Sequence, residues 1–191
     1  MSEVAARCVV IGASAGAVQA LSEILPALPA DFPLPILVVV HIPSDRQNIL
    51  PSLLQAKCRM TVREAEDKEP ALAGVVYFAP PDYHLLAEAD GSLSLSSDEE
   101  VLYSRPSIDV LFESAADAYG AALIGIVLTG ANPDGAKGLK AIADAGGTAL
   151  VEDPAAAYAA EMPTAALKEC AAARVVPLAE MAPNLMKECG V

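Results

Sequence analysis

The sequence predicts a doubly wound α/β fold, in which a mainly parallel sheet lies between two layers of helices (three-layer α/β/α). Six continuous apolar runs are bounded by turn residues, as is typical of strands that are covered on both faces. Helical patterns lie between several of these runs, and this alternation of strand and helix favours a parallel sheet. Fifteen prolines and twelve glycines punctuate the 191 residues without forming a tail, so we expect one domain over residues 1–191.

The predicted elements follow the chain in order. Apolar runs predict strands at residues 8–11, 36–40, 75–79, 123–128, 148–151 and 174–176. Helical patterns predict helices at residues 18–28, 49–56, 108–119, 135–145, 163–170 and 182–188. Residues 83–97 depart from the alternation, because Asp90 and Gly91 lie between two apolar segments and residues 93–95 alternate apolar with polar. This pattern predicts a β-hairpin at an edge of the sheet.

The composition argues against several classes of protein. A formal net charge of -13 and the lack of a basic run argue against a nucleic-acid partner. No segment approaches the roughly 20 apolar residues of a membrane span, so we expect no direct membrane insertion. Glycines and Gln19 interrupt the N-terminal apolar stretch that a secretory signal would need.

The four cysteines indicate a cytoplasmic protein with reduced thiols. They are Cys8, Cys58, Cys170 and Cys189. They are widely separated and include no Cys-x-x-Cys pair, which argues against a metal site or a disulfide framework. We expect neither a metal ion nor a cofactor.

A Gly-x-Ser-x-Gly sequence at residues 12–16 directly follows the first predicted strand. A serine on such a sharp strand-to-helix turn holds its hydroxyl clear of the sheet, and small neighbours let a substrate carbonyl approach it. Ser14 is therefore the candidate nucleophile. A glycine-rich turn at this place also occurs as a plain connection or as a phosphate cradle, so the other strand ends must distinguish these interpretations.

Two further candidates follow other predicted strands. His41, one of two histidines, directly follows the strand at 36–40, and imidazole is the side chain that exchanges a proton near neutral pH. Asp134 lies on the turn after the strand at 123–128, where it would accept the second N–H of the histidine or simply begin a helix. Open parallel sheets place their chemistry beyond the carboxyl ends of the strands, so Ser14, His41 and Asp134 are expected together.

The chain order of these residues argues against two common α/β classes. The order is serine, histidine, aspartate, whereas the acid precedes the histidine in α/β-hydrolases. A dinucleotide-binding domain would have a glycine at the position of Ser14 and an acid at that of His41. Nucleotide binding by the glycine turn is left as an alternative, and thermal stabilisation by nucleotides would reveal it.

An ordered series of motifs runs from about residue 8 to about residue 176. The motifs are IGASAG at 11–16, HIP at 41–43, VVYFAPPDYH at 75–84, RPSIDVLF at 105–112, LTG at 128–130, DGA at 134–136 and EMPTAA at 161–166. In this series the chain resembles the CheB family, the bacterial chemotaxis receptor protein-glutamate methylesterases.

The resemblance implies a serine carboxyl-ester hydrolase that acts on glutamate methyl esters in the cytoplasmic helical bundle of a chemoreceptor. In some members it also implies deamidation of receptor glutamines. It assigns Ser14 as the nucleophile, His41 as the general base and acid, and Asp134 as the carboxylate that orients the histidine. It further implies oxyanion donors at the backbone N–H groups of His41 and of Ala131, which stands where the family has a methionine.

The resemblance is incomplete in two places. The family's Leu-Thr-Gly-Met-Gly-x-Asp-Gly is LTGANPDG here, and Pro133 restricts Asn132, so we expect the loop of Asp134 to sit differently. This departure keeps open an alternative function, that of a non-catalytic relative which binds a receptor or another signalling protein. Family members commonly carry an N-terminal receiver domain, and none is expected here, because the first predicted strand begins a few residues from Met1.

Five other residues in these motifs are candidates for supporting roles. His84 is expected to be loop structure or a substrate contact, and Arg105 is expected to line the cleft with its guanidinium. Ser107 suits the N-cap of a helix. Thr129 and Met162 are expected to pack behind the site.

Overall fold

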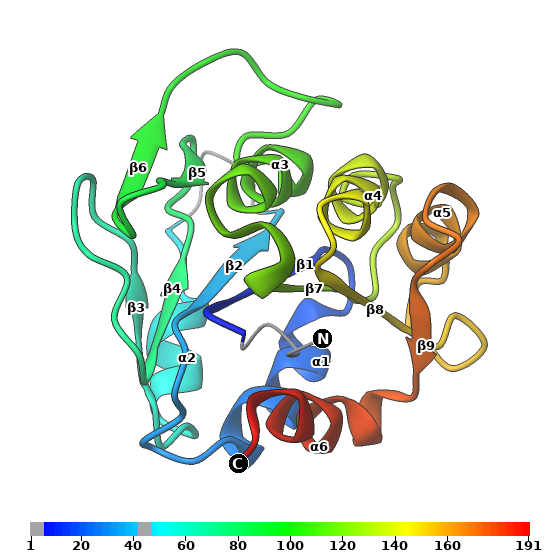
Figure 1. Cartoon of the computed structure of the whole chain (residues 1–191), viewed down its shortest axis with the longest axis horizontal. Helices are drawn as coiled ribbons and strands as arrows, with labels where there is room; N and C mark the ends of the chain where they lie inside the picture. Colours follow the sequence, from blue (N-terminus) through cyan, green and yellow to red (C-terminus); the bar gives the residue numbers. More distant parts are fainter. Residues whose placement is uncertain (1–5, 42–46) are drawn as a thin grey trace.

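A seven-stranded parallel sheet forms the centre of the structure, a computed structural model that describes residues 6–41 and 47–191 (Figure 1). The strands are β1 (Cys8–Ala13), β2 (Ile36–Val40), β3 (Thr61–Glu64), β4 (Val75–Phe78), β7 (Leu123–Val127), β8 (Thr148–Glu152) and β9 (Arg174–Val176). Their order is β3-β4-β2-β1-β7-β8-β9, and every neighbouring pair is parallel. The chain extends the sheet first on one side of β1 and then on the other, and such a reversal is where open α/β sheets form a ligand crevice.

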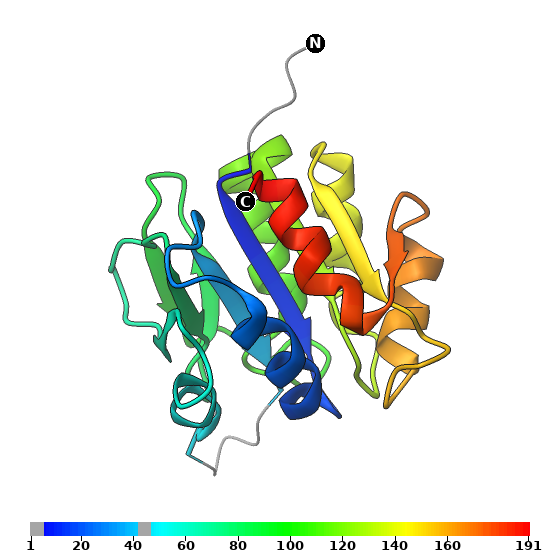
Figure 2. The ribbon, with the colours of Figure 1, turned by 90° about the horizontal axis from the view of Figure 1, so that it is seen from below.

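Helices cover both faces of the sheet. One face carries α1 (Ala17–Ile24), the short 3-10 helix η1 (Leu25–Ala27), α2 (Leu50–Gln55) and α6 (Leu178–Cys189), and the other carries α3 (Ile108–Tyr119), α4 (Ala136–Asp144) and α5 (Glu161–Glu169). Figure 2 shows α1 and α6 lying over the strands on the first face, roughly along the strand direction. Successive residues of β1 alternate between the two apolar cores: Val9 packs with the first group of helices and Val10 with the second. The predicted doubly wound α/β fold is confirmed.

Each predicted strand and helix is present, with ends that differ by a few residues. The sequence missed β3, whose residues Thr61–Glu64 are partly exposed and mostly polar, because an edge strand needs no continuous apolar run. Helix α6 begins at Leu178 rather than at residue 182, and Pro183 lies inside it. Pro183 is the sixth residue of the helix, so its missing N–H removes one helical hydrogen bond without ending the helix.

The predicted hairpin is also present, and it forms a small antiparallel sheet of its own from β5 (His84–Ala87) and β6 (Leu93–Ser96). It lies on the side of β3 and β4, where Leu93 exchanges backbone hydrogen bonds of 2.8 Å with Lys68 and Glu69. Its apolar residues Leu85 and Leu93 belong to the same core as α3. The hairpin therefore covers the α3 side of the sheet edge without extending the seven-stranded ladder.

Within the described residues, none of the helices is both long enough and apolar enough to cross a membrane.

Candidate active site

The turn that carries Ser14 is held at the carboxyl end of β1. The Ser14 N–H donates to the carbonyl of Thr129 at 2.9 Å, and the Ser14 carbonyl accepts from Ala17 at the start of α1 at 2.9 Å. Gly16 has φ 86°, and a Cβ there would lie 2.8 Å from Cβ of Tyr158. Both the backbone conformation and the available space therefore require glycine, and the half-buried serine sits at a fixed point of the turn.

Ser14 and His41 line one cavity, at the carboxyl ends of β1 and β2. The cavity measures about 1060 Å³, and apolar side chains of α1 and α2 form part of its wall. These include Val18 and Leu53, and Ile49, directly before α2, adds to the wall; all three are exposed. A site with convergent polar groups beside an apolar wall can bind a substrate side chain together with the surface that carries it.

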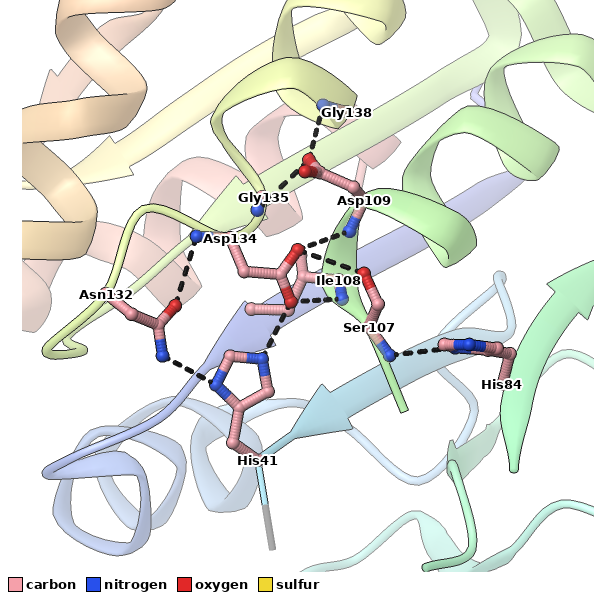
Figure 3. Close-up of polar contacts among 9 residues, drawn as sticks. All are labelled: His41, His84, Ser107, Ile108, Asp109, Asn132, Asp134, Gly135 and Gly138. Atoms are coloured by element: carbon pink, nitrogen blue, oxygen red, sulfur yellow. Dashed lines mark hydrogen bonds and ion pairs between the residues drawn. The ribbon is translucent and has the colours of Figure 1, made fainter. Parts of the chain in front are cut away.

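His41 is hydrogen-bonded through both ring nitrogens (Figure 3). Its Nε2 lies 2.7 Å from Oδ2 of Asp134, and its Nδ1 lies 3.0 Å from Nδ2 of Asn132. The imidazole is only 12% exposed. Within the part of the chain that the structure describes, no hydrogen bond joins the Ser14 hydroxyl to His41. The structure thus brings His41 and Asp134 into contact and places Ser14 in the same cavity; residues 42–43 of the HIP motif lie outside the described residues.

Asp134 is fully buried at the N-terminus of α3, although it precedes α4 in the sequence. Its carboxylate accepts the N–H groups of Ile108 at 2.7 Å and Asp109 at 3.0 Å, together with the hydroxyl of Ser107 at 3.0 Å (Figure 3). Burial favours the protonated acid, but the hydrogen bonds from His41 and from these two amides outweigh it and hold the pKa of Asp134 below its ordinary value. Asp134 is therefore an anion that is fixed in position before any substrate binds.

Asp109 makes the reciprocal contact, which the sequence analysis missed. Its Oδ1 accepts the N–H groups of Gly135 at 3.0 Å and Gly138 at 2.7 Å, at the start of α4. Burial, partly offset by the Gly138 amide and reinforced by the charge of Asp134, raises the pKa of Asp109 to about 6. The N-termini of α3 and α4 are thus each capped by a carboxylate from the neighbouring segment. The sequence signal that could have identified this contact is an acid, Asp109, in the first helical turn after the N-cap residue Ser107.

His84 is structural. The ring is buried, its Nδ1 accepts the N–H of Ser107 at 3.1 Å, and its Nε2 donates to the carbonyl of Glu99 at 2.9 Å. Of the two expected roles, loop structure therefore fits. Ser107 occupies the N-cap position of α3, but its hydroxyl donates to Asp134 instead of capping its own helix. His84 and Ser107 together connect the hairpin to the carboxylate of Asp134.

The expectation for Arg105 is wrong: it is not among the residues that line the cavity. Its guanidinium donates to Asp82 at 2.6 and 3.1 Å and to the carbonyls of Ser97 and Asp98 at 3.0 Å each. These acceptors engage three guanidinium nitrogens, so Arg105 ties together the loops around the hairpin.

Thr129 and Met162 support the nucleophile turn from behind, as predicted. The Thr129 hydroxyl donates to the carbonyl of Ala15 at 2.8 Å and accepts the N–H of Ala159 at 2.8 Å. Met162 is buried against Gly130, where a Cβ would lie 2.6 Å from Cε of the methionine. These contacts fix the end of β7 against the turn of Ser14.

The two backbone N–H groups that are expected to bind the oxyanion differ in whether they already donate a hydrogen bond. The His41 N–H donates to the carbonyl of Ala13 at 3.3 Å, a long hydrogen bond that continues the β1–β2 ladder. Among the described residues, no hydrogen bond occupies the N–H of Ala131. Within residues 6–41 and 47–191, no group of three His, Cys, Asp or Glu side chains could hold a metal ion.

A doubly wound α/β domain with a histidine–aspartate pair and a serine in one cavity has the arrangement of a serine-type hydrolase. The sequence profile described as "CheB methylesterase" matches residues 9–185. The chain belongs to the CheB methylesterase family, as the motifs indicated.

Three relatives illustrate the match. The crystal structure of the Thermotoga maritima CheB methylesterase catalytic domain has a TM-score of 0.91 and 35% sequence identity, over 96% of this chain and 99% of that one. A Leptospira interrogans protein named "Putative protein-glutamate methylesterase/protein-glutamine glutaminase" is 47% identical, over 92% of this chain and 91% of its own length. The Geobacter metallireducens "protein-glutamate methylesterase/protein-glutamine glutaminase 3" is 37% identical over 100% of this chain, which spans only 54% of that relative.

Proposed function

We propose that this protein is a protein-glutamate methylesterase that hydrolyses γ-glutamyl methyl esters in the cytoplasmic helical bundle of a chemoreceptor. Family membership supports the reaction, and the observation that carries the mechanism is the His41–Asp134 contact of 2.7 Å beside Ser14 in one cavity. Such a substrate lies in the cytoplasm, and the protein would act there. The same chemistry applied to a side-chain amide is deamidation, which the names of the relatives also include.

In the proposed mechanism, Ser14 attacks the ester carbonyl while His41 accepts its proton. Asp134 orients the imidazole and stabilises the imidazolium that forms. The ester then expels methoxide, which takes the proton from His41 and leaves as methanol. Water repeats the sequence on the glutamyl-serine ester and regenerates the glutamate carboxylate.

The negative oxygen of each tetrahedral intermediate needs fixed donors. We propose the Ala131 N–H as one donor, and the His41 N–H as the other after its long bond to Ala13 lengthens further. A backbone donor does not depend on the side chain, so the alanine in place of the family's methionine keeps this function.

Methanol release from a methylated chemoreceptor tests the proposal. Ser14→Ala should abolish catalysed release, and Ser97→Ala, an exposed serine outside the cavity, should leave it unchanged. Equal rates for the wild type and Ser14→Ala would refute the role of Ser14.

A non-catalytic binding protein is the second candidate, and one observation favours it: Asn132, not Ser14, occupies Nδ1 of His41. A fluorophosphonate probe distinguishes the two functions. Labelling that requires both Ser14 and His41 indicates an enzyme, whereas a binding protein would remain unlabelled.

A further inference from the structure

Asn132 occupies the position that a nucleophilic serine needs. Its Nδ2 lies 3.0 Å from Nδ1 of His41, while Nε2 of the same ring faces Asp134 at 2.7 Å. The imidazole has only these two nitrogens. Both already have a hydrogen-bond partner, so neither is free to accept a hydrogen bond from the Ser14 hydroxyl.

The orientation of the Asn132 amide is fixed by a second contact. The backbone N–H of Asp134 donates to Oδ1 of Asn132 at 3.0 Å, so the other end of the amide, the NH2 group, must face His41. Nδ1 of His41 is then the acceptor and carries no proton, and the proton lies on Nε2 toward the Asp134 carboxylate. Two independent neighbours therefore select the same neutral form of the ring.

We propose that Asn132 is a latch, a positioning residue that covers the basic nitrogen of His41 in the resting enzyme. This inference rests on the proposed function, because it assigns the latch to the base that activates Ser14. Asn132 must turn away before Nδ1 can accept the Ser14 proton. If it stayed, the new Nδ1–H would point at the N–H of the amide.

The proton balance of the open state is simple. The Ser14 O–H proton moves to Nδ1 as the serine oxygen forms its bond to the ester carbon, and the Nε2 proton remains hydrogen-bonded to Asp134. The imidazolium then returns the Nδ1 proton to the departing methoxide. Asn132 takes no part in either transfer, and it covers the ring again once Nδ1 is neutral.

The latch depends on the side chain at position 132, since a residue without one, such as glycine, could not reach the histidine. Pro133 follows Asn132 and restricts its backbone, so the side chain loses less conformational freedom when it covers His41. The altered loop therefore still delivers Asp134 to His41 and adds a competitor for Ser14.

The test compares Asn132→Ser with Asn132→Ala. Serine can still accept the Asp134 N–H in a local turn but is too short to reach His41, so it removes the latch while it keeps the loop contact. Alanine removes both contacts. Asn184→Ser, on the exposed side of α6, is the matched control.

The first readout is the second-order rate of Ser14 labelling by a fluorophosphonate probe. Asn132→Ser should react about threefold to tenfold faster than the wild type, the ratio expected when one competing hydrogen bond is lost. Asn184→Ser should react at the wild-type rate. Unchanged or slower labelling of both Asn132 variants would overturn the latch while the proposed function stands. No Ser14-dependent labelling in any variant would overturn the proposed function, and the latch with it.

The second readout is the ¹⁵N NMR spectrum of the two histidines. The Nδ1 resonance of His41 should move in Asn132→Ser and Asn132→Ala, because it loses its donor, and the signals of His84 should stay in place. A purely structural effect on the loop predicts no such change in Asn132→Ser. An unmoved Nδ1 resonance would overturn the latch, whatever the labelling rates are.

Discussion

His41 and His84, the two histidines of the chain, use the same hydrogen-bonding groups for different purposes. Both rings are engaged through both nitrogens. The partners of His84 are a backbone carbonyl and a backbone N–H, whereas those of His41 are a carboxylate and a side-chain amide. His84 is 2% exposed as a residue, and the His41 imidazole is 12% exposed at the cavity.

These partners explain why His41 and not His84 suits the proton transfer of the proposed mechanism. Nδ1 of His84 accepts a backbone N–H that cannot turn away, so this nitrogen offers no place for another partner. His41 faces the Asp134 anion, which stabilises the imidazolium, and its other partner is a side chain that can turn away. The buried histidine between backbone groups connects segments of the fold, and the proposed base is the histidine between a carboxylate and a side chain that can turn away.

His41→Ala should have the largest effect on this comparison. Methanol release should fall by about 10³-fold or more, because the general base and its charge pairing are lost together. The free energy of unfolding should also fall, because the buried Asp134 carboxylate loses one of its partners, although Ser107, Ile108 and Asp109 still donate to it. Steady-state methanol release and thermal unfolding measure the two effects. Activity in His41→Ala comparable to that in His84→Ala would contradict the assignment.

Asp134→Asn should be next, with a loss of about 10²- to 10⁴-fold in methanol release. The amide cannot stabilise an imidazolium, and its NH2 end would oppose one of the donors that now bind the carboxylate. Asp98→Asn, an exposed acid in the loop before α3, is the control. A full rate in Asp134→Asn would show that His41 needs no anion.

Asp134→Asn should also change how the free energy of unfolding depends on pH. The folded-state pKa of Asp134 lies below its ordinary value of about 3.9, so the wild type gains stability above that pH and loses it as the pH falls through the folded pKa. Asp134→Asn should lack this acid-dependent contribution. Urea unfolding between pH 2 and 6 measures it, and parallel curves for the two proteins would contradict the depressed pKa.

His84→Ala should act chiefly on stability. It leaves the buried Ser107 N–H without a partner and removes the bond to the carbonyl of Glu99, an exposed residue, which together cost about 1–3 kcal/mol in the free energy of unfolding. His84→Asn should recover part of this loss, because its carbonyl can accept the Ser107 N–H. Methanol release should fall far less than in His41→Ala. If His84→Ala unfolded at the same denaturant concentration as the wild type, the hydrogen bonds of His84 would contribute nothing to stability.

Asp109→Asn should have the smallest effect. Because folding raises the pKa of Asp109 to about 6, the wild type loses stability as the pH rises from about 4 to about 6. The amide oxygen still accepts from Gly135 and Gly138, so the variant should gain on the order of 2–3 kcal/mol over the wild type across that interval. A difference in unfolding free energy that is constant with pH would contradict the raised pKa.

Local patterns predicted most of the fold, because buried parallel strands are continuous apolar runs and their helices repeat apolar residues at regular spacing. They failed for Thr61–Glu64, where only the pairing with β4 makes a strand, and at the start of α6. For the site, the rule that parallel sheets form their sites at the carboxyl ends of the strands predicted that Ser14, His41 and Asp134 lie at the same edge of the sheet, and they do. The catalytic roles of these residues stay predictions.

Sequence patterns alone predicted the parallel sheet, the glycine turn of Ser14, the histidine after β2 and the family to which the chain belongs. Each of these depends on residues that are close in the chain or on motifs that keep their order. Tertiary packing was needed to show that Asp134 caps α3, that Asp109 caps α4 in return, and that Asn132 contacts His41. Hydrogen bonds between segments 25 to 91 residues apart depend on distances and directions that only packing sets, and no local pattern encodes them.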